Sequence, residues 1–578
     1  MDMPAALPFA PFSPMPSRLI RKFKAHLFQF AFLLLATLPV LGYDWKPDPS
    51  LNLQDQRVRL YKISRTYFEE HWDASVGEEQ RDMRHAHPHM TGVTLSYAYT
   101  LLMTKDPKDR AFAESIITHV LTKQCLNNSS ATYGSFVPYF EDEWATAVNP
   151  DPNYGQFLGL GLADIIDLDN QEGHLLTPPL RQQVDDAFKL TVDFTIRRDV
   201  SPDYTNIALT SAAVAAAGDK LFGIPGARDF ALSKLYWILA RTLPGTTFTE
   251  YMAPTYYGVD LAGLYELQHY AASPEVSAPT ERLLTAFWKD IAASYNPATF
   301  QLGGPQARAY GDNMLEYVAS LKYFLFFALD GKYPISDHET DQTWGLSQLS
   351  WLANSQIDPR PEMTETPAPW RQVGVASRPG MTVSQYRKGD FTLGSVSAQS
   401  VWQQQRNVVA YWPIAQPWWD VGFFLDKSSL TQSNGYAHFF SKQEGNAVLV
   451  ALTGKMPNPP TGGLKLEFNE LAEGKPITNG PPGSFAVEDG GVTTYVYPVT
   501  QSATGALTYS KDEKRVDLQR GWDTADHAGN IGVLSYLVVF RSPGEDAPIV
   551  KDLTFVSNDK GATASANVNG TALSVDAK

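Results

Sequence analysis

Residues 355–369 read SQIDPRPEMTETPAP, and the hydrophobic period of the chain changes across this segment. Its four prolines fix backbone torsions and remove hydrogen-bond donors, so the segment continues neither a helix nor a central strand. Before it, apolar residues recur at helical spacing, and after it they alternate. We therefore expect a junction between two halves that are built differently.

The half before this segment is predicted to be helical from about residue 58 to 352. Apolar residues line one helical face over 112–121, and further amphipathic runs cover 180–192, 206–222, 228–243, 259–270, 280–295 and 312–329. Loops that contain Gly and Pro separate these runs, and no strand is expected between them. Such helices bury their apolar faces only against one another, which predicts a bundle, a solenoid or a closed ring of hairpins.

The half after the segment is predicted to be a large antiparallel β domain. Alternating patterns occur at residues 381–386, 391–394, 447–452, 493–499 and 533–540, and turn sequences such as Lys388-Gly389-Asp390 bound them. Because helices and strands are segregated along the chain, the fold class is α+β. We expect a helical domain over 43–360 and a β domain over 361–578.

The composition excludes several classes of function. The 578 residues carry 47 Lys and Arg against 62 Asp and Glu, and a net charge of -15 argues against a nucleic-acid partner. Charged residues are 19% and aromatic residues 12% of the chain, as in a well-packed globular protein. Cys125 is the single cysteine, so no intrachain disulfide and no thiolate pair for a metal is expected, and we predict that it is buried.

The first 42 residues resemble a secretory signal. A basic stretch that contains Arg18 and Lys24 precedes the apolar run LFQFAFLLLATLPVL at 27–41. We expect secretion of the body of the protein, or an uncleaved membrane anchor that keeps this body outside the cytosol. Glycosylation sequons at Asn127, Asn128 and Asn569 agree with a secretory route.

Five loops of the helical half carry clustered polar and aromatic residues: 85–89 (HAHPH), 141–144 (EDEW), 204–206 (YTN), 250–258 (EYMAPTYYG) and 303–312 (GGPQARAYGD). Loops at one rim of a helical ring can display such residues in a shared cleft. The alternating histidines of the first loop fit a metal site or a solvent-facing loop, and we predict neither a metal nor a cofactor.

Each candidate residue also has a purely structural interpretation. Asn206 is either the N-cap of helix 207–217 or a polar group of the cleft. Tyr256 and Tyr257 are expected on an extended segment, where neighbouring side chains point in opposite directions and one faces the cleft. Arg308 is a surface charge or an anion clamp, and Trp144 is a core residue or a platform for a sugar ring.

The order of the two halves, together with Asn206 at a helix start, FTEYMAPTYY at 248–257 and GPQARAYG at 304–311, resembles the toroid-plus-sandwich polysaccharide lyases. These are the heparinase II/III-like, alginate and chondroitin/hyaluronate lyases. The resemblance implies an (α/α) toroid followed by an antiparallel β-sandwich. It further implies β-elimination from an acidic, uronate-containing polysaccharide, with catalytic residues Asn206, Tyr256 or Tyr257, Arg308 and Tyr310.

The sequence departs from this group at Ile207, where several members place a histidine directly after the asparagine. A histidine must then come from elsewhere, such as His87 or His438. The predicted substrate-binding residues are His87, Trp144, Glu250 and His438. Two alternatives stay open: a glycoside hydrolase that uses paired carboxylates such as Glu250 and Asp312, and a non-catalytic carbohydrate-binding or cell-surface protein.

Overall fold

The computed structural model describes part of the chain, and all structural statements below concern that part. The described residues are 53–73, 78–79, 89–144, 151–242, 244–311, 313–315, 320–336, 351–352, 357, 359–401, 404–413, 418–425, 428–429, 437–455, 462–469, 471, 477–500, 508–510, 515–521, 527–528, 531–558 and 561–577. The signal-like segment 1–42, His85, His87 and Asp312 lie outside them. No described helix is long and apolar enough to cross a membrane.

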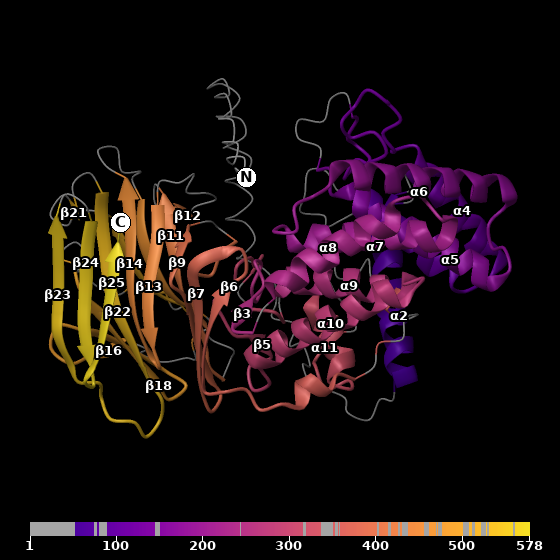
Figure 1. Ribbon diagram of the computed structural model, residues 1–578. Helices are drawn as coiled ribbons and strands as arrows, with labels where there is room; N and C mark the ends of the chain where they lie inside the picture. Colours follow the sequence, from indigo (N-terminus) through magenta and orange to yellow (C-terminus); the bar gives the residue numbers. More distant parts are fainter. Residues whose placement is uncertain are drawn as a thin grey trace.

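Ten α-helices of the described residues form the N-terminal half, and sheets form the C-terminal half on the other side of the molecule (Figure 1). The predicted α+β segregation is therefore confirmed. The helices are α2 (Leu53–His71), α3 (Thr91–Leu102), α4 (Pro107–Leu121), α5 (Tyr154–Glu172), α6 (Pro178–Arg198), α7 (Thr205–Phe222), α8 (Ala227–Arg241), α9 (Pro254–Tyr270), α10 (Pro274–Ser294) and α11 (Leu321–Ala328).

Successive helices pair as hairpins that form a ring. Helices α3, α5, α7 and α9 pack side by side as an inner layer around an axial cavity, while α4, α6, α8 and α10 form the outer layer. The start of the ring meets its end, because the guanidinium of Arg59 in α2 lies over the ring of Phe326 in α11 and donates to the carbonyl of Ile335 at 3.0 Å. The predicted toroid of hairpins is thus present.

Helix α7 lies in the middle of this packing. Every residue from Thr205 to Gly218 is buried, and most are Ala, Ser, Thr or Gly, which let neighbouring helices approach closely. A Cβ at Gly263 of α9 would lie 3.1 Å from the backbone of Leu209. Gly223 ends α7 in the left-handed conformation that favours glycine. The first residues of α7 and α9 lie at the same rim of the ring, since they line one cavity there.

The C-terminal half contains three stacked antiparallel sheets, and a second hydrophobic cluster lies between the second and third. The sheet next to the helices has the order β19 (Thr508–Ser510), β20 (Arg515–Gly521), β15 (Gly462–Asn469), β11 (Trp418–Leu425), β10 (Val408–Tyr411), β8 (Phe391–Val396), β7 (Arg378–Lys388), β6 (Trp370–Val375) and β3 (Thr246–Thr247), with β12 (Ser428–Ser429) beside β11. The second is β16 (Ile477–Asn479), β17 (Phe485–Asp489), β18 (Val492–Pro498), β22 (Ile531–Arg541), β14 (Ala447–Lys455), β13 (Ala437–Glu444) and β9 (Ala398–Ser400), with β21 (His527–Ala528) beside β22. The third is β23 (Val550–Asn558), β24 (Gly561–Val568) and β25 (Thr571–Ala577).

Three details differ from the prediction. The helix expected over 312–329 begins only at Leu321, and residues 313–315, which the structure describes, are not helical. The helical half contains two-residue strands where none was expected: β1 (Trp72–Asp73), β2 (Glu78–Glu79), β4 (Tyr295–Asn296), β5 (Gln301–Leu302) and β3. Strand β3 pairs in parallel with β6, so the helical half contributes a strand to the first sheet.

The loop that carries Arg308 is held against the first sheet. A Cβ at Gly394 of β8 would lie 1.7 Å from the carbonyl oxygen of Gly304, so only glycine permits this approach. Gln306 and Arg406 exchange two backbone hydrogen bonds of 2.9 Å each. Backbone contacts between the two halves therefore fix the position of the loop.

Candidate active site

A cavity of about 70 Å³ lies where α5, α7 and α9 begin, at one rim of the ring. Inner helices of one ring start at the same rim, which brings together loops that are far apart in the sequence. The polar residues that line it are Asp151, Asn153, Tyr204, Asn206, Thr255, Tyr256 and Tyr310.

Asn206 is fully buried and lies within α7, not at its N-cap, which is Tyr204. Its side-chain nitrogen lies 3.0 and 2.8 Å from the two carboxylate oxygens of Glu250, and its backbone N–H donates to the same carboxylate at 3.0 Å. The capping interpretation of Asn206 is therefore wrong. Glu250 supplies the negative charge that unpaired N–H groups and the helix dipole favour at a helix N-terminus.

The amide of Asn206 keeps hydrogen-bonding capacity for a ligand. The two oxygens of one carboxylate subtend a much smaller angle at nitrogen than the two N–H bonds of an amide, so one N–H points at Glu250 and the other does not. The side-chain oxygen of Asn206 has no hydrogen-bond partner among the described residues. A buried amide with one donor and one acceptor to spare lines this cavity.

Arg308 connects Glu250 with the tyrosines. Its guanidinium lies 3.4 Å from Glu250 Oε1 and donates to the side-chain oxygen of Gln404 at 3.0 and 2.9 Å. The guanidinium carbon lies 3.9 Å from the ring centroid of Tyr256. Since an arginine stays charged, Arg308 offsets the charge of Glu250 and places a positive charge on the ring of Tyr256.

Tyr256 and Tyr257 lie in the first turn of α9, which corrects the expectation of an extended segment. Tyr256 lines the cavity, and its hydroxyl is 2.6 Å from that of Tyr310. Burial raises the pKa of Tyr256 far above its usual value, against the opposing effect of Arg308. The phenol of Tyr256 is therefore protonated at ordinary pH.

Tyr257 faces the core and not the cavity. It is completely buried and donates a hydrogen bond of 2.6 Å to Asp290. Asp290 also accepts from Thr247 and pairs with Arg371 of β6. Tyr257 therefore belongs to the contact between the two halves, and the choice between the two tyrosines as cavity residue falls on Tyr256.

The other predicted residues occupy different positions. Tyr310 is half exposed at the cavity mouth. Glu250, expected to bind substrate, lies behind Asn206 and Arg308 and does not line the cavity. Trp144 donates to the carbonyl of Lys123, His438 is exposed on β13, and neither lines the cavity. His87 lies outside the described residues, so its role stays a prediction.

Sequence reasoning missed a chain of three residues beside the cavity, two of which line it. Arg198, in the last turn of α6, donates to Asn153 Oδ1 at 2.7 Å, and Asn153 Nδ2 donates to the hydroxyl of Tyr204 at 3.1 Å. The motif that contains Asn206 also contains Tyr204, which was the one available indication. A basic residue at a helix C-terminus is usually explained by the helix dipole alone, which hides Arg198.

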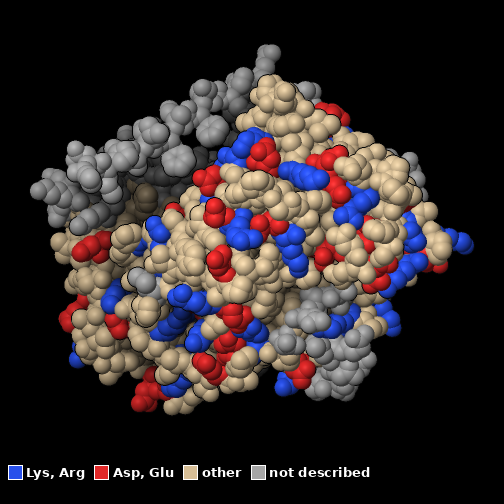
Figure 2. Space-filling view, turned by 45° about the vertical axis from the view of Figure 1, so that its right-hand side comes forward, with Lys and Arg blue, Asp and Glu red and all other residues tan. Residues whose placement is uncertain are grey.

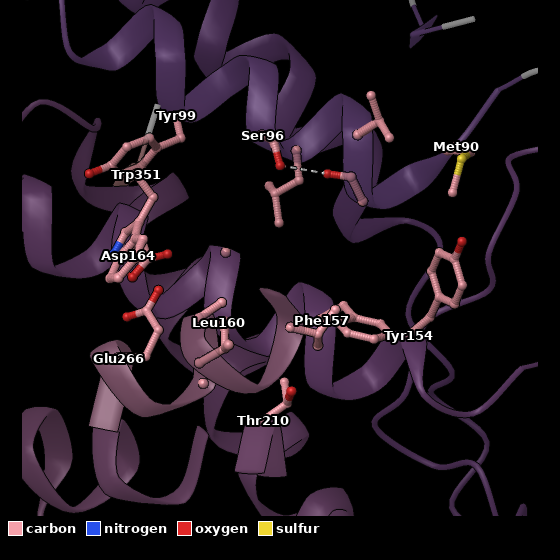
Figure 3. Close-up of a pocket in the computed structure, with 17 residues that line it drawn as sticks. Met90, Ser96, Tyr99, Tyr154, Phe157, Leu160, Asp164, Thr210, Glu266 and Trp351 are labelled. Atoms are coloured by element: carbon pink, nitrogen blue, oxygen red, sulfur yellow. Dashed lines mark hydrogen bonds between the residues drawn. The ribbon is translucent and has the colours of Figure 1, made fainter. Parts of the chain in front are cut away.

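A second cavity follows the axis of the ring and shares Phe157 and Val259 with the first. Figure 3 shows Asp164 of α5 and Glu266 of α9 approaching each other near one end of it, beside Trp351. Burial raises the pKa of Asp164 to about 7, and burial together with the neighbouring Asp164 raises the pKa of Glu266 well above its usual value. The pair therefore holds a proton near neutral pH.

This carboxyl pair does not match a glycosidase. Asp164 and Glu266 interact directly enough to shift each other's pKa, whereas the carboxyl groups of glycosidases are about 5 to 9.5 Å apart, on either side of the scissile bond. The alternative pair proposed from the sequence includes Asp312, which lies outside the described residues, and Glu250, which is engaged by Asn206 and Arg308. The hydrolase alternative therefore gains no support from either pair.

The remaining observations concern metal ligands, surface charge and the single cysteine. Within the part of the chain that the structure describes, no group of three or more His, Cys, Asp or Glu residues is placed to hold a metal. His89 instead contacts Glu141 at 2.5 Å and Asp73 at 3.4 Å. On the face shown in Figure 2, basic and acidic side chains are interspersed. Cys125 is buried, as predicted.

Comparisons with solved structures give low identities over long alignments. A crystal structure of heparinase III is 11% identical, with a TM-score of 0.44, and the match covers 96% of this chain and 95% of that chain. The heparinase III BT4657 gene product is 11% identical, with a TM-score of 0.38 and coverages of 97% and 96%. Streptomyces avermitilis α-L-rhamnosidase complexed with L-rhamnose is 9% identical, with a TM-score of 0.24 and coverages of 84% and 38%.

No curated protein matches the sequence. The family described as "Domain of unknown function (DUF8769)" matches residues 58–348, which are half of the chain and include most of the helical ring, and the chain belongs to this family.

Proposed function

We propose that this protein is a lyase that cleaves a uronate-containing polysaccharide by β-elimination in the cavity at the rim of the ring. The observation that carries the proposal is the convergence of Asn206, Tyr256 and Tyr310 on one cavity, with Arg308 on the ring of Tyr256. About a hundred residues of chain separate Asn206 from Arg308, so local packing does not account for the cluster.

The chemistry of elimination explains why these residue types meet. The C5 proton of a uronate is weakly acidic, and its removal builds negative charge toward the neighbouring carboxylate. Hydrogen-bond donors fixed at that carboxylate stabilise the developing charge. The spare N–H of Asn206 is directed away from Glu250 and is available for this purpose.

The remaining groups take distinct roles. Tyr256, protonated and buried, donates a proton to the oxygen that leaves C4, and Tyr310 connects its hydroxyl to the cavity mouth. Glu250 and Arg308 are positioning residues, because they hold Asn206 and the ring of Tyr256 without lining the cavity. Glu250 is therefore reassigned from substrate binding to the support of Asn206.

A panel of uronate polymers tests this function. Elimination creates an unsaturated uronate with ultraviolet absorbance together with a new reducing end, whereas hydrolysis creates the reducing end alone. We expect both products with at least one polymer. Reducing ends without the absorbance indicate a hydrolase, and binding without either product indicates a carbohydrate-binding protein.

The place of action is part of the proposal. The signal-like segment 1–42 and the sequons at Asn127, Asn128 and Asn569 support export, with an uncleaved membrane anchor as the alternative. Fractionation of cells that express the untagged full-length protein separates the two, because an anchored protein sediments with membranes. Recovery in the cytosol contradicts both.

A further inference from the structure

We propose that Tyr204 is the second proton-transfer residue of this site and that Arg198, acting through Asn153, prepares its oxygen to receive a proton. The inference rests on the proposed elimination and assigns the residue that removes the C5 proton. Tyr204 lines the cavity together with Asn206 and Tyr256, so all three are within reach of one sugar ring.

The direction of the hydrogen bonds carries the argument. A guanidinium only donates, so the oxygen of Asn153 must face Arg198, at 2.7 Å. The amide nitrogen of Asn153 therefore faces the Tyr204 hydroxyl, at 3.1 Å, and donates to it. A hydrogen bond donated to the phenolic oxygen favours the phenolate, and it turns the hydroxyl hydrogen of the neutral form away from Asn153.

The pKa of Tyr204 is raised overall, chiefly by burial, and the charges around it act in both directions. Arg198 bonds to the amide oxygens of Asn153 and Gln156, and the charge of Asp151 also acts on it. The guanidinium carbon of Arg308 lies 5.9 Å from the ring centroid of Tyr204. Burial, Glu250 and Asp151 raise the pKa of Tyr204, while Arg308 lowers it.

Tyr204 and Tyr256 are prepared for opposite tasks. The hydroxyl of Tyr256 meets another hydroxyl, that of Tyr310, whereas that of Tyr204 meets an amide donor backed by an arginine. In the proposed step the Tyr204 phenolate takes the C5 proton, and the C–H electron pair forms the C4–C5 double bond. The C4–O bond breaks, and the leaving oxygen takes the proton of Tyr256. Proton exchange with solvent restores both tyrosines.

Asn153→Asp tests this arrangement in the full chain. It keeps an acceptor for Arg198 but replaces the donor that faces Tyr204 with a carboxylate oxygen. We expect the rise of kcat/KM with pH to move upward by about one pH unit or more. Arg198→Gln should move it in the same direction and Arg198→Lys by less. Arg197→Gln is the matched control, because the exposed Arg197 pairs with Asp193.

Two further measurements decide between outcomes. Tyr204→Phe should lower kcat by ~10²-fold or more while the protein remains folded, as thermal unfolding would show. The ultraviolet phenolate titration of the wild type minus that of Tyr204→Phe isolates Tyr204, and Asn153→Asp should move this difference curve to higher pH. Full activity of Tyr204→Phe, or an unmoved curve and profile, overturns the assignment but not the lyase. Absence of elimination by the wild type on every polymer overturns the proposed function and this assignment with it.

Discussion

The rim cavity and the axial cavity of the same helical ring treat buried carboxyl groups in opposite ways. At the rim, Glu250 is held by donors from Asn206 and Arg308, although its charge also acts on the buried Asp260. Along the axis, Asp164 and Glu266 face each other, and the hydroxyl of Tyr270 donates to Asp164 at 3.0 Å. A carboxylate paired with donors can stay charged and orient its neighbours, whereas two facing carboxyl groups must hold a proton. This difference supports the rim cavity as the proposed place of the chemistry.

The largest expected effect contrasts the two neighbouring tyrosines. Tyr256→Phe removes the proton donor of the rim cavity, so activity should fall by ~10²-fold or more with the fold retained. Tyr257→Phe leaves Asp290 without one of its donors and should lower the free energy of unfolding by about 1 to 3 kcal/mol. Elimination rates per folded molecule and chemical unfolding measure both. Equal losses of activity in the two variants would contradict their separate roles.

Loss of the Glu250 carboxylate should lower stability and activity together. Glu250→Ala leaves the backbone N–H of Asn206 and the guanidinium of Arg308 without their carboxylate, at a cost of about 3 kcal/mol. Glu250→Gln keeps the shape and should cost less. Urea unfolding measures the difference between the two variants. If Glu250→Ala is as stable as the wild type, Glu250 is not the support of Asn206.

A shift of the loop that carries Arg308 should lower activity at the rim cavity and leave the axial cavity unchanged. Gly394→Ala places a methyl group against the carbonyl of Gly304, so the loop must shift, at about 1 to 3 kcal/mol. Gly374→Ala in the same sheet is the control, since its Cβ would have an ordinary contact of 3.8 Å. Activity should fall in the first variant only. Unchanged activity there would show that the close contact with the sheet does not position Arg308.

The last prediction concerns the carboxyl groups of Asp164 and Glu266 in the axial cavity. Between the ordinary pKa of an aspartate, about 4, and the raised pKa of about 7 at Asp164, the folded protein binds more protons than the unfolded chain. The free energy of unfolding must therefore fall as the pH rises through this interval. Asp164→Asn should flatten this slope. Asp193→Asn on the exposed surface is the control, and an identical slope in the wild type and Asp164→Asn would contradict the shared proton.

The sequence predicted the two halves because hydrophobic period is a local property. Closure of the ring is not local: Arg59 and Ile335 are separated by 276 residues, and no local sequence pattern predicts their contact. The choice between Tyr256 and Tyr257 needed the knowledge that Pro254 starts a helix, since direction differs between a helix and an extended segment. Helix α9 is buried on almost every side, so its sequence has little amphipathic pattern to mark that start.

The candidate site was predictable in its residue types but not in its pairings. Asn206, Tyr256, Arg308 and Tyr310 stood out because polar and aromatic residues cluster in their loops, whereas Glu250 supports the helix start at Asn206 from 44 residues away. Asp164 and Glu266 were overlooked within the apolar stretches LADIIDL and LAGLYELQHY, although an acidic residue in such a stretch is itself an indication of a buried pair.

The most direct test of the proposed β-elimination is to count double bonds and reducing ends in the same digest of a uronate polymer. For every new reducing end, the proposal predicts one unsaturated uronate, with both signals lost together in Tyr256→Phe. Reducing ends that form without unsaturated uronate would contradict elimination and assign the cavity to hydrolysis.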